Sequence, residues 1–198
     1  MRRQPVYFLV DVSKTMAGEP IIKVKETIKQ IIHNLRNDPY CLETVYLSLI
    51  TFSDEVEFIS LWNEISKVLP SLKIDTATKV RQLGKVLEYL EKEIESSVAK
   101  TTIEQKGDRK PIVVLFTNNT KIDENISSIE FWRSQSRNRC CFITVIIDEE
   151  TALNKLGMLS DDIATLSDLD NISFDHLIEA VSRGYTKPFR ELKSIDNY

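Results

Sequence analysis

Short, uninterrupted apolar runs alternate along this chain with longer segments of helical periodicity. A strand that is apolar throughout, rather than at every second position, is typical of a parallel sheet buried on both faces. Residues 20–35 and 80–98 instead space their apolar side chains three and four positions apart, as an amphipathic helix does. The apolar runs are residues 6–10, 45–52, 111–116 and 140–147.

The order of these elements predicts the fold class. Residues 56–59 follow a Ser-Asp-Glu turn and are typical of a hairpin partner for the second run. Helical segments separate the other strands, which favours parallel pairing through crossovers. We therefore predict an α/β fold in three layers, with a doubly wound, Rossmann-like, mostly parallel sheet and one antiparallel edge strand. The remaining expected elements are helices at 126–136, 151–159 and 174–181, a strand at 163–166 and an irregular segment at 62–72.

Length and composition narrow the function classes. The 198 residues suit one domain, expected over residues 1–185 with a polar tail at 186–198. A net charge of −4 lacks the positive footprint of a nucleic-acid binder, and no apolar run approaches a membrane span. The N-terminus shows no signal-peptide pattern, and three cysteines without zinc spacing indicate reduced thiols. We expect a cytoplasmic protein that binds neither nucleic acid nor membrane.

Oxygen-bearing side chains alternate directly after the first apolar run, in Asp11-Val12-Ser13-Lys14-Thr15. Binding sites of doubly wound sheets lie at the carboxyl ends of the strands. One carboxylate and two hydroxyls are hard ligands, which suit Mg²⁺ or Mn²⁺ better than Zn²⁺. The same residues also suit a structural role, in which Asp11 and Ser13 cap the next helix and fix a turn.

The segment 5–21 resembles the start of a von Willebrand factor type A domain, whose pattern is an apolar strand followed by D-x-S-x-S-M-x-G-x-P. The short bacterial TerY/YegL-type members are the most similar, and the resemblance extends from about residue 5 to residue 181. Further agreeing stretches are 38–44, 50–52 and 101–108. This resemblance implies the von Willebrand factor A fold and a metal-ion-dependent adhesion site, in which three loops hold a divalent cation.

The resemblance also assigns the metal ligands. They are Asp11, Ser13 and Thr15 in the first loop, Thr78 in the second with Thr76 as the alternative, and Asn118 in the third. The family has Asp where Asn118 stands and usually Gly where Lys14 stands, so this site carries less negative charge. Loss of an outer ligand typically lowers metal affinity ~10–100-fold. We therefore expect binding of Mg²⁺ or Mn²⁺ that is weak, or that depends on an Asp or Glu carboxylate from a partner.

The function implied by the resemblance is a non-enzymatic protein–protein interaction module. TerY-type members are associated with bacterial tellurium-resistance and stress-response gene clusters, beside a protein kinase and a phosphatase. The implied partner is therefore a protein of that kind.

A magnesium-dependent phosphatase of the haloacid dehalogenase type is the alternative. Asp11 would be its nucleophile, Thr117-Asn118 its second motif, and Asp161-Asp162 its metal-binding pair. Ser13 stands where that family has its acid/base Asp, and a serine hydroxyl cannot deliver a proton at neutral pH as a carboxylic acid can. The sequence therefore favours the interaction module.

Overall fold

A computed structural model of the chain describes residues 2–67, 74, 82–118, 126–136, 139–147 and 159–166. Within these residues a six-stranded sheet has the order β3-β2-β1-β4-β5-β6. Only the edge pair β2–β3 is antiparallel among the described pairs, which confirms the predicted fold class. The strands are β1 (Gln4–Asp11), β2 (Val45–Phe52), β3 (Val56–Glu64), β4 (Ile112–Thr117), β5 (Cys141–Ile146) and β6 (Asp162–Thr165).

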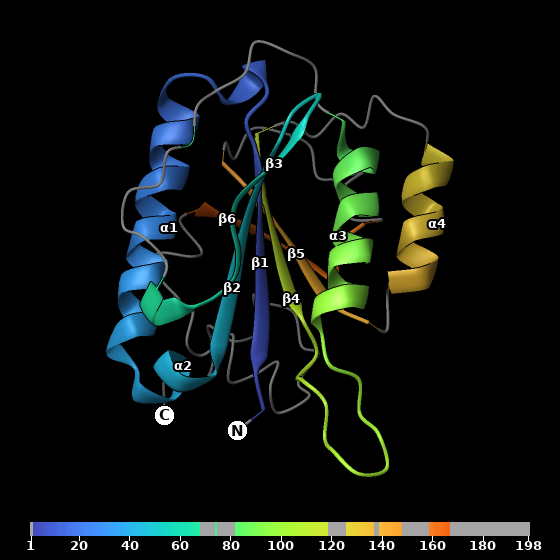
Figure 1. The fold of residues 1–198 in the computed structure, drawn as a ribbon. Helices are drawn as coiled ribbons and strands as arrows, with labels where there is room; N and C mark the ends of the chain where they lie inside the picture. The colour runs from blue at the N-terminus through green and yellow to red at the C-terminus, as the bar shows by residue number, and fades with distance from the viewer. Residues whose placement is uncertain are drawn as a thin grey trace, which may run out of the picture.

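Helices cover both faces of the sheet (Figure 1). Helix α1 (Glu19–Asn37) lies on one face, and α3 (Leu83–Ser97) and α4 (Ile126–Ser136) lie on the other. Successive β1 side chains enter different cores: Phe8 packs in the cluster that includes the buried side of α1, and Tyr7 packs with residues of α3. Because neither face of β1 meets water, its central residues 6–10 form an uninterrupted apolar run. None of the described helices is long and apolar enough to cross a bilayer.

The chain between α1 and β2 differs from the prediction. We expected the first helix to end near Pro39 without a successor, but a six-residue helix, α2 (Pro39–Thr44), follows it directly. Asp38 both ends α1 and caps α2, because its carboxylate accepts a hydrogen bond from the Cys41 N–H at 2.7 Å. A helix this short has too few turns to produce a periodic apolar pattern.

Strand β3 is longer than predicted. We expected it at 56–59, with an irregular segment from Trp62 onward, but it continues to Glu64. Its pairing with β2 shifts register twice near Leu49, and Trp62 has a positive φ of 44°. Such bulges break the alternation by which a strand is recognised in sequence. The helices expected at 151–159 and 174–181, and the domain boundary at 185, lie outside the described residues.

Candidate metal site at the carboxyl ends of the strands

Asp11 is the last residue of β1 and is fully buried. Parallel pairing sets Val10 beside Phe116 of β4, so Thr117 at the end of β4 and Asn118 just after it lie at the edge of the sheet where Asp11 lies. This edge is at the top of Figure 1. The structure thus brings together the first and third predicted loops.

Two hydrogen bonds hold the Asp11 carboxylate. Oδ1 accepts from the Ser13 backbone N–H at 2.9 Å, and Oδ2 accepts from the Thr117 hydroxyl at 2.7 Å. Thr117 is fully buried like Asp11, so water cannot replace either bond. Hydrogen bonds to a charged acceptor are stronger than neutral ones, and these two fix the orientation of the carboxylate.

The hydroxyls of Ser13 and Thr15 lie beside each other, with their oxygens 3.1 Å apart. Ser13 is 3% exposed and Thr15 is exposed, so this pair runs from the buried part of the site to its opening. Ser13 precedes a short 3-10 turn, Lys14–Met16, but its side chain makes no capping hydrogen bond. Asp11 therefore does have the structural role of fixing the turn, whereas the Ser13 hydroxyl is directed to Thr15 instead of the backbone.

The spacing and chemistry of these oxygens fit a hard divalent cation. Octahedral Mg²⁺ binds oxygens at about 2.0–2.1 Å, which places neighbouring ligands about 2.8–3.0 Å apart. The 3.1 Å between the Ser13 and Thr15 oxygens fits two such neighbouring positions. The described part of the chain contains no cluster of three or more His, Cys, Asp or Glu side chains, so a cation at this edge would rely largely on the hydroxyl oxygens.

The second predicted loop reaches the described structure only at its end. Thr76 and Thr78 lie outside the described residues. The Gln82 N–H, just before α3, donates to the Ser53 carbonyl at the end of β2 at 2.8 Å. Lys85 of α3 donates to the Asp54 carbonyl at 2.9 Å. The chain that follows the second loop is thus held at the same edge of the sheet as Asp11.

Two features of this edge bear on the predicted ligand set. Asn118 directly follows β4 and is half-buried. Thr117 was not among the predicted metal-site residues, yet its hydroxyl holds the Asp11 carboxylate. The signal for that contact is the pairing of β1 with β4, which joins residues 106 positions apart and is not visible in local sequence.

The acidic pair of the phosphatase alternative is far from Asp11. Asp161 precedes β6 and Asp162 begins it, and β6 is three strands from β1, roughly 14 Å at ~4.8 Å per strand. The Asp161 carboxylate accepts hydrogen bonds from Arg133 at 2.6 Å and from the Phe142 N–H at 2.8 Å. Because this pair cannot share a metal with Asp11, the geometry does not support the phosphatase alternative.

The cysteines show no features of a nucleophile or a metal ligand. Cys41, Cys140 and Cys141 form no disulfide within the described residues, and Cys41 and Cys140 are buried. Burial raises the pKa of Cys140 to about 12 and that of Cys141 to about 11. These thiols therefore stay protonated at neutral pH, where only a thiolate would attack or bind a metal.

Residues 6–180 match the von Willebrand factor type A domain family, and the chain belongs to that family. Its members are commonly protein-interaction modules with a metal site. No curated protein sequence matches the chain.

Solved structures show the same fold at low sequence identity. The SpRpn10 VWA domain is 16% identical with a TM-score of 0.63, over 85% of this chain and 94% of that one. A von Willebrand factor type A protein from Catenulispora acidiphila is 11% identical with a TM-score of 0.62, over 97% and 42%. Proximal thread matrix protein 1 from the mussel byssus, solved with a zinc-occupied MIDAS motif, is 17% identical with a TM-score of 0.58, over 91% and 46%. This chain thus spans less than half of the last two.

Proposed function

We propose that this chain is a non-enzymatic interaction module that binds Mg²⁺ or Mn²⁺ at the Asp11 edge and, through the metal, an Asp or Glu carboxylate of a partner protein. The observation that carries the proposal is the pair of adjacent hydroxyls, Ser13 and Thr15, at the opening of the site above a carboxylate fixed by Thr117. These groups are oriented before any ligand arrives.

Each side chain has a distinct role in this proposal. Ser13 and Thr15 hold the cation directly, together with Thr78 or, alternatively, Thr76. Asp11 supplies the negative charge beneath the metal, and Asn118 supplies an amide oxygen without charge. The cation, when bound, is a Lewis acid that accepts an anionic ligand.

The charge of the site explains why a partner carboxylate would bind. Asp11 contributes one negative charge against two positive charges of the cation, and the exposed Lys14 adds a further positive charge nearby. The site therefore keeps an excess of positive charge, which weakens metal binding and favours an incoming carboxylate. Metal binding and partner binding are therefore cooperative, because the carboxylate of the partner neutralises the positive charge that the cation leaves.

The described residues around the site lack the groups of a hydrolase. His33, on α1, shares a hydrogen bond of 3.1 Å with Asn37 in the last turn of that helix, away from Asp11. Burial raises the pKa of Cys140 and Cys141, so these thiols are protonated and supply no nucleophile at neutral pH.

The cellular system proposed for this chain follows from its resemblance to TerY-type proteins. The TerY-like segments 5–21 and 101–108 support a bacterial, cytoplasmic protein of a tellurium-resistance or stress-response system. The partner in this proposal is the kinase or the phosphatase of the same gene cluster.

Calorimetric titration with Mn²⁺ tests the metal site. We expect weak binding by the wild-type chain, no binding by Ser13→Ala, and ~10–100-fold tighter binding by Asn118→Asp, which restores the missing charge. Ser96→Ala, an exposed serine on α3, is the matched control and should behave as wild type. If neither wild type nor Asn118→Asp binds Mn²⁺ at millimolar metal, the proposed site is wrong.

The partner is tested separately. Binding of a purified kinase and a purified phosphatase from a tellurium-resistance gene cluster should be measured in Mn²⁺ and in EDTA, with wild type and with Asn118→Asp. We expect binding that requires metal and strengthens in the variant. Equal binding in EDTA would show that any contact uses another surface.

A further inference from the structure

The connection between α3 and β4 projects from the body of the molecule at the end opposite to Asp11 (Figure 1). We call residues 99–107 the projecting loop. At its tip Ile103 is fully exposed, at 106% of the reference area. The turn is ordered by two hydrogen bonds, from the Thr102 N–H to the Gln105 carbonyl at 2.9 Å and from the Gln105 N–H to the Thr102 hydroxyl at 3.1 Å.

The base of the projecting loop is clamped. The Asp108 carboxylate accepts hydrogen bonds from the Ala99 N–H at 2.7 Å and from the Arg3 guanidinium at 2.8 and 2.7 Å. Arg2 donates to the Gly107 carbonyl at 2.8 Å, and a Cβ at Gly107 would lie 2.3 Å from the Ala99 carbonyl oxygen. A single exposed isoleucine is ordinary by itself. Here it stands at the tip of a pre-ordered loop, which reduces the entropy lost on docking.

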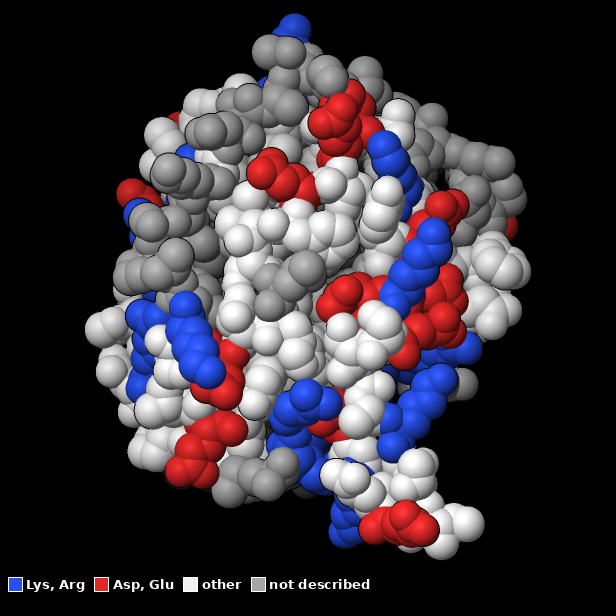
Figure 2. Space-filling view, in the orientation of Figure 1, with Lys and Arg blue, Asp and Glu red and all other residues white. Residues whose placement is uncertain are grey.

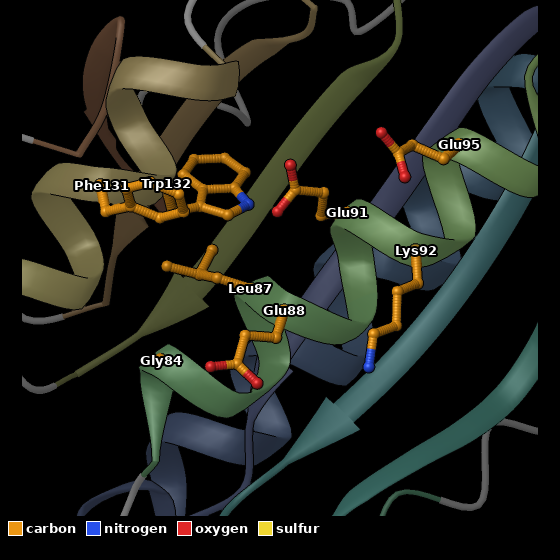
Figure 3. A pocket seen from close by; sticks show the side chains of 8 residues that line it. All are labelled: Gly84, Leu87, Glu88, Glu91, Lys92, Glu95, Phe131 and Trp132. Carbon is orange, nitrogen blue, oxygen red and sulfur yellow. The ribbon is translucent and has the colours of Figure 1, made fainter.

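A groove of about 560 Å³ lies between α3 and α4 (Figure 3). Three glutamates, Glu88, Glu91 and Glu95, line it from one face of α3, and Leu87, Phe131 and Trp132 give it apolar walls. Figure 2 shows Asp and Glu side chains on this side of the molecule with Lys and Arg side chains among them, and the projecting loop carrying both signs of charge.

The charges of the groove are only partly compensated. Arg139 lies 3.5 Å from Glu91 and 3.0 Å from Glu95. The Lys92 ammonium lies over the Tyr89 ring, 5.8 Å from its centroid. Within the part of the chain that the structure describes, Glu88 has no ion-pair partner. The Glu88 end of the groove is therefore open to a cation.

The walls of the groove also carry unused binding capacity. Phe131 is 65% exposed, which is unusual for a large aromatic side chain. Trp132 is 3% exposed, and its buried Nε1 has no hydrogen-bond acceptor among the described residues. In Figure 3 this nitrogen lies on the side of the ring that faces Glu91. An occupant with an apolar side chain and a cation would match the exposed Phe131 ring and the three glutamates.

We propose that the projecting loop of one copy of this chain docks in the α3–α4 groove of a second copy. Ile103 supplies the apolar side chain, and Lys100 and Lys106 on either side of it supply cations for the glutamates and outnumber the one acidic residue of the loop, Glu104. The loop points away from the groove of its own chain, so the occupant is a second copy (Figure 1). The contact is head-to-tail, which yields open chains, and its small area makes it weak.

Sedimentation velocity tests this contact. The weight-average sedimentation coefficient should rise between about 10 μM and about 1 mM wild-type chain, where contacts of this size associate. Ile103→Ser and Glu88→Lys should each abolish the rise. Ile22→Ser and Glu26→Lys, exposed residues of α1, are matched controls and should keep it. EDTA should have no effect, which separates this surface from the metal site.

Mixing the two variants gives the sharper result. The Ile103→Ser chain keeps its groove and the Glu88→Lys chain keeps its loop, so an equimolar mixture should form dimers and nothing larger. Circular dichroism checks that each variant is folded. The proposal is overturned if wild type stays monomeric at the highest concentration, if either variant associates as wild type does, or if the mixture stays monomeric.

Discussion

Replacing Thr117 with valine removes one hydroxyl and nearly conserves shape. The Asp11 Oδ2 atom then loses its 2.7 Å hydrogen bond in a place where both residues are fully buried. A hydrogen bond to a charged group contributes ~1.5–3 kcal/mol. A buried acceptor left without a donor is not compensated by water, so its loss costs the full desolvation penalty. We expect Thr117→Val to lower the free energy of unfolding by about 2 kcal/mol, which lowers Tm by roughly 4–8 °C in a chain of this length.

Thr117→Ser is the matched control, because it keeps the hydroxyl and loses only a methyl group, at about 1 kcal/mol. Urea denaturation followed by circular dichroism at pH 7 in EDTA measures both variants. In an Asp11→Asn background the valine substitution should cost only ~0.5–1.5 kcal/mol, because the acceptor is then neutral. A valine variant as stable as the serine variant, or an equal cost in both backgrounds, would refute the assigned contact.

Three further predictions follow from the described contacts. Gly18→Ala should lower the free energy of unfolding by about 1–3 kcal/mol, because φ is 88° at this residue. A Cβ there would meet nothing within 4 Å, so the cost is conformational and not steric. An unchanged urea midpoint would contradict this prediction. Asp108→Asn should lower the free energy of unfolding by about 1–2 kcal/mol, a value reduced because the Arg3 side chain is 33% exposed. The variant should also self-associate more weakly than wild type, and a sedimentation coefficient that rises with concentration as in wild type would argue against the clamp. Cys140 and Cys141, with pKa values raised to about 12 and about 11, should react far more slowly with a thiol reagent at pH 8 in the native than in the unfolded chain. The contribution of these buried thiols to stability is fully present below the ordinary pKa near 9.0 and declines as pH rises toward 11. A thiol in the native chain that reacts at the rate of the unfolded chain would show that Cys140 and Cys141 are not buried.

The layered sheet was predictable because burial on both faces leaves a direct trace in sequence. In β1, Phe8 and Tyr7 enter opposite cores, so no polar residue interrupts the run. The amphipathic helices were predictable for the same reason, since only one side of α1 is buried, along the stripe that ends at Leu35.

Local irregularities were not predictable from periodicity. The bulged pairing of β3 near Leu49 and the positive φ of Trp62 depend on contacts between two strands. Helix α2 depends on the single cap that Asp38 provides, and one residue does not make a pattern.

The first loop of the candidate site could be predicted from the sequence. The alternation of Asp11, Ser13 and Thr15 identifies the first loop, because hydroxyls two residues apart meet at one turn. The role of Thr117 was hidden, because it depends on which strand pairs with β1. Topology, rather than composition, determines that contact.

The most direct test of the proposed metal site is a crystal structure with Mn²⁺, located by its anomalous scattering. The proposal predicts one strong peak within ligand distance of both the Ser13 and Thr15 oxygens, with Asp11 still bonded to Thr117. A fully soaked crystal with no peak at these two oxygens, or with manganese bound only elsewhere, would contradict the proposed metal site.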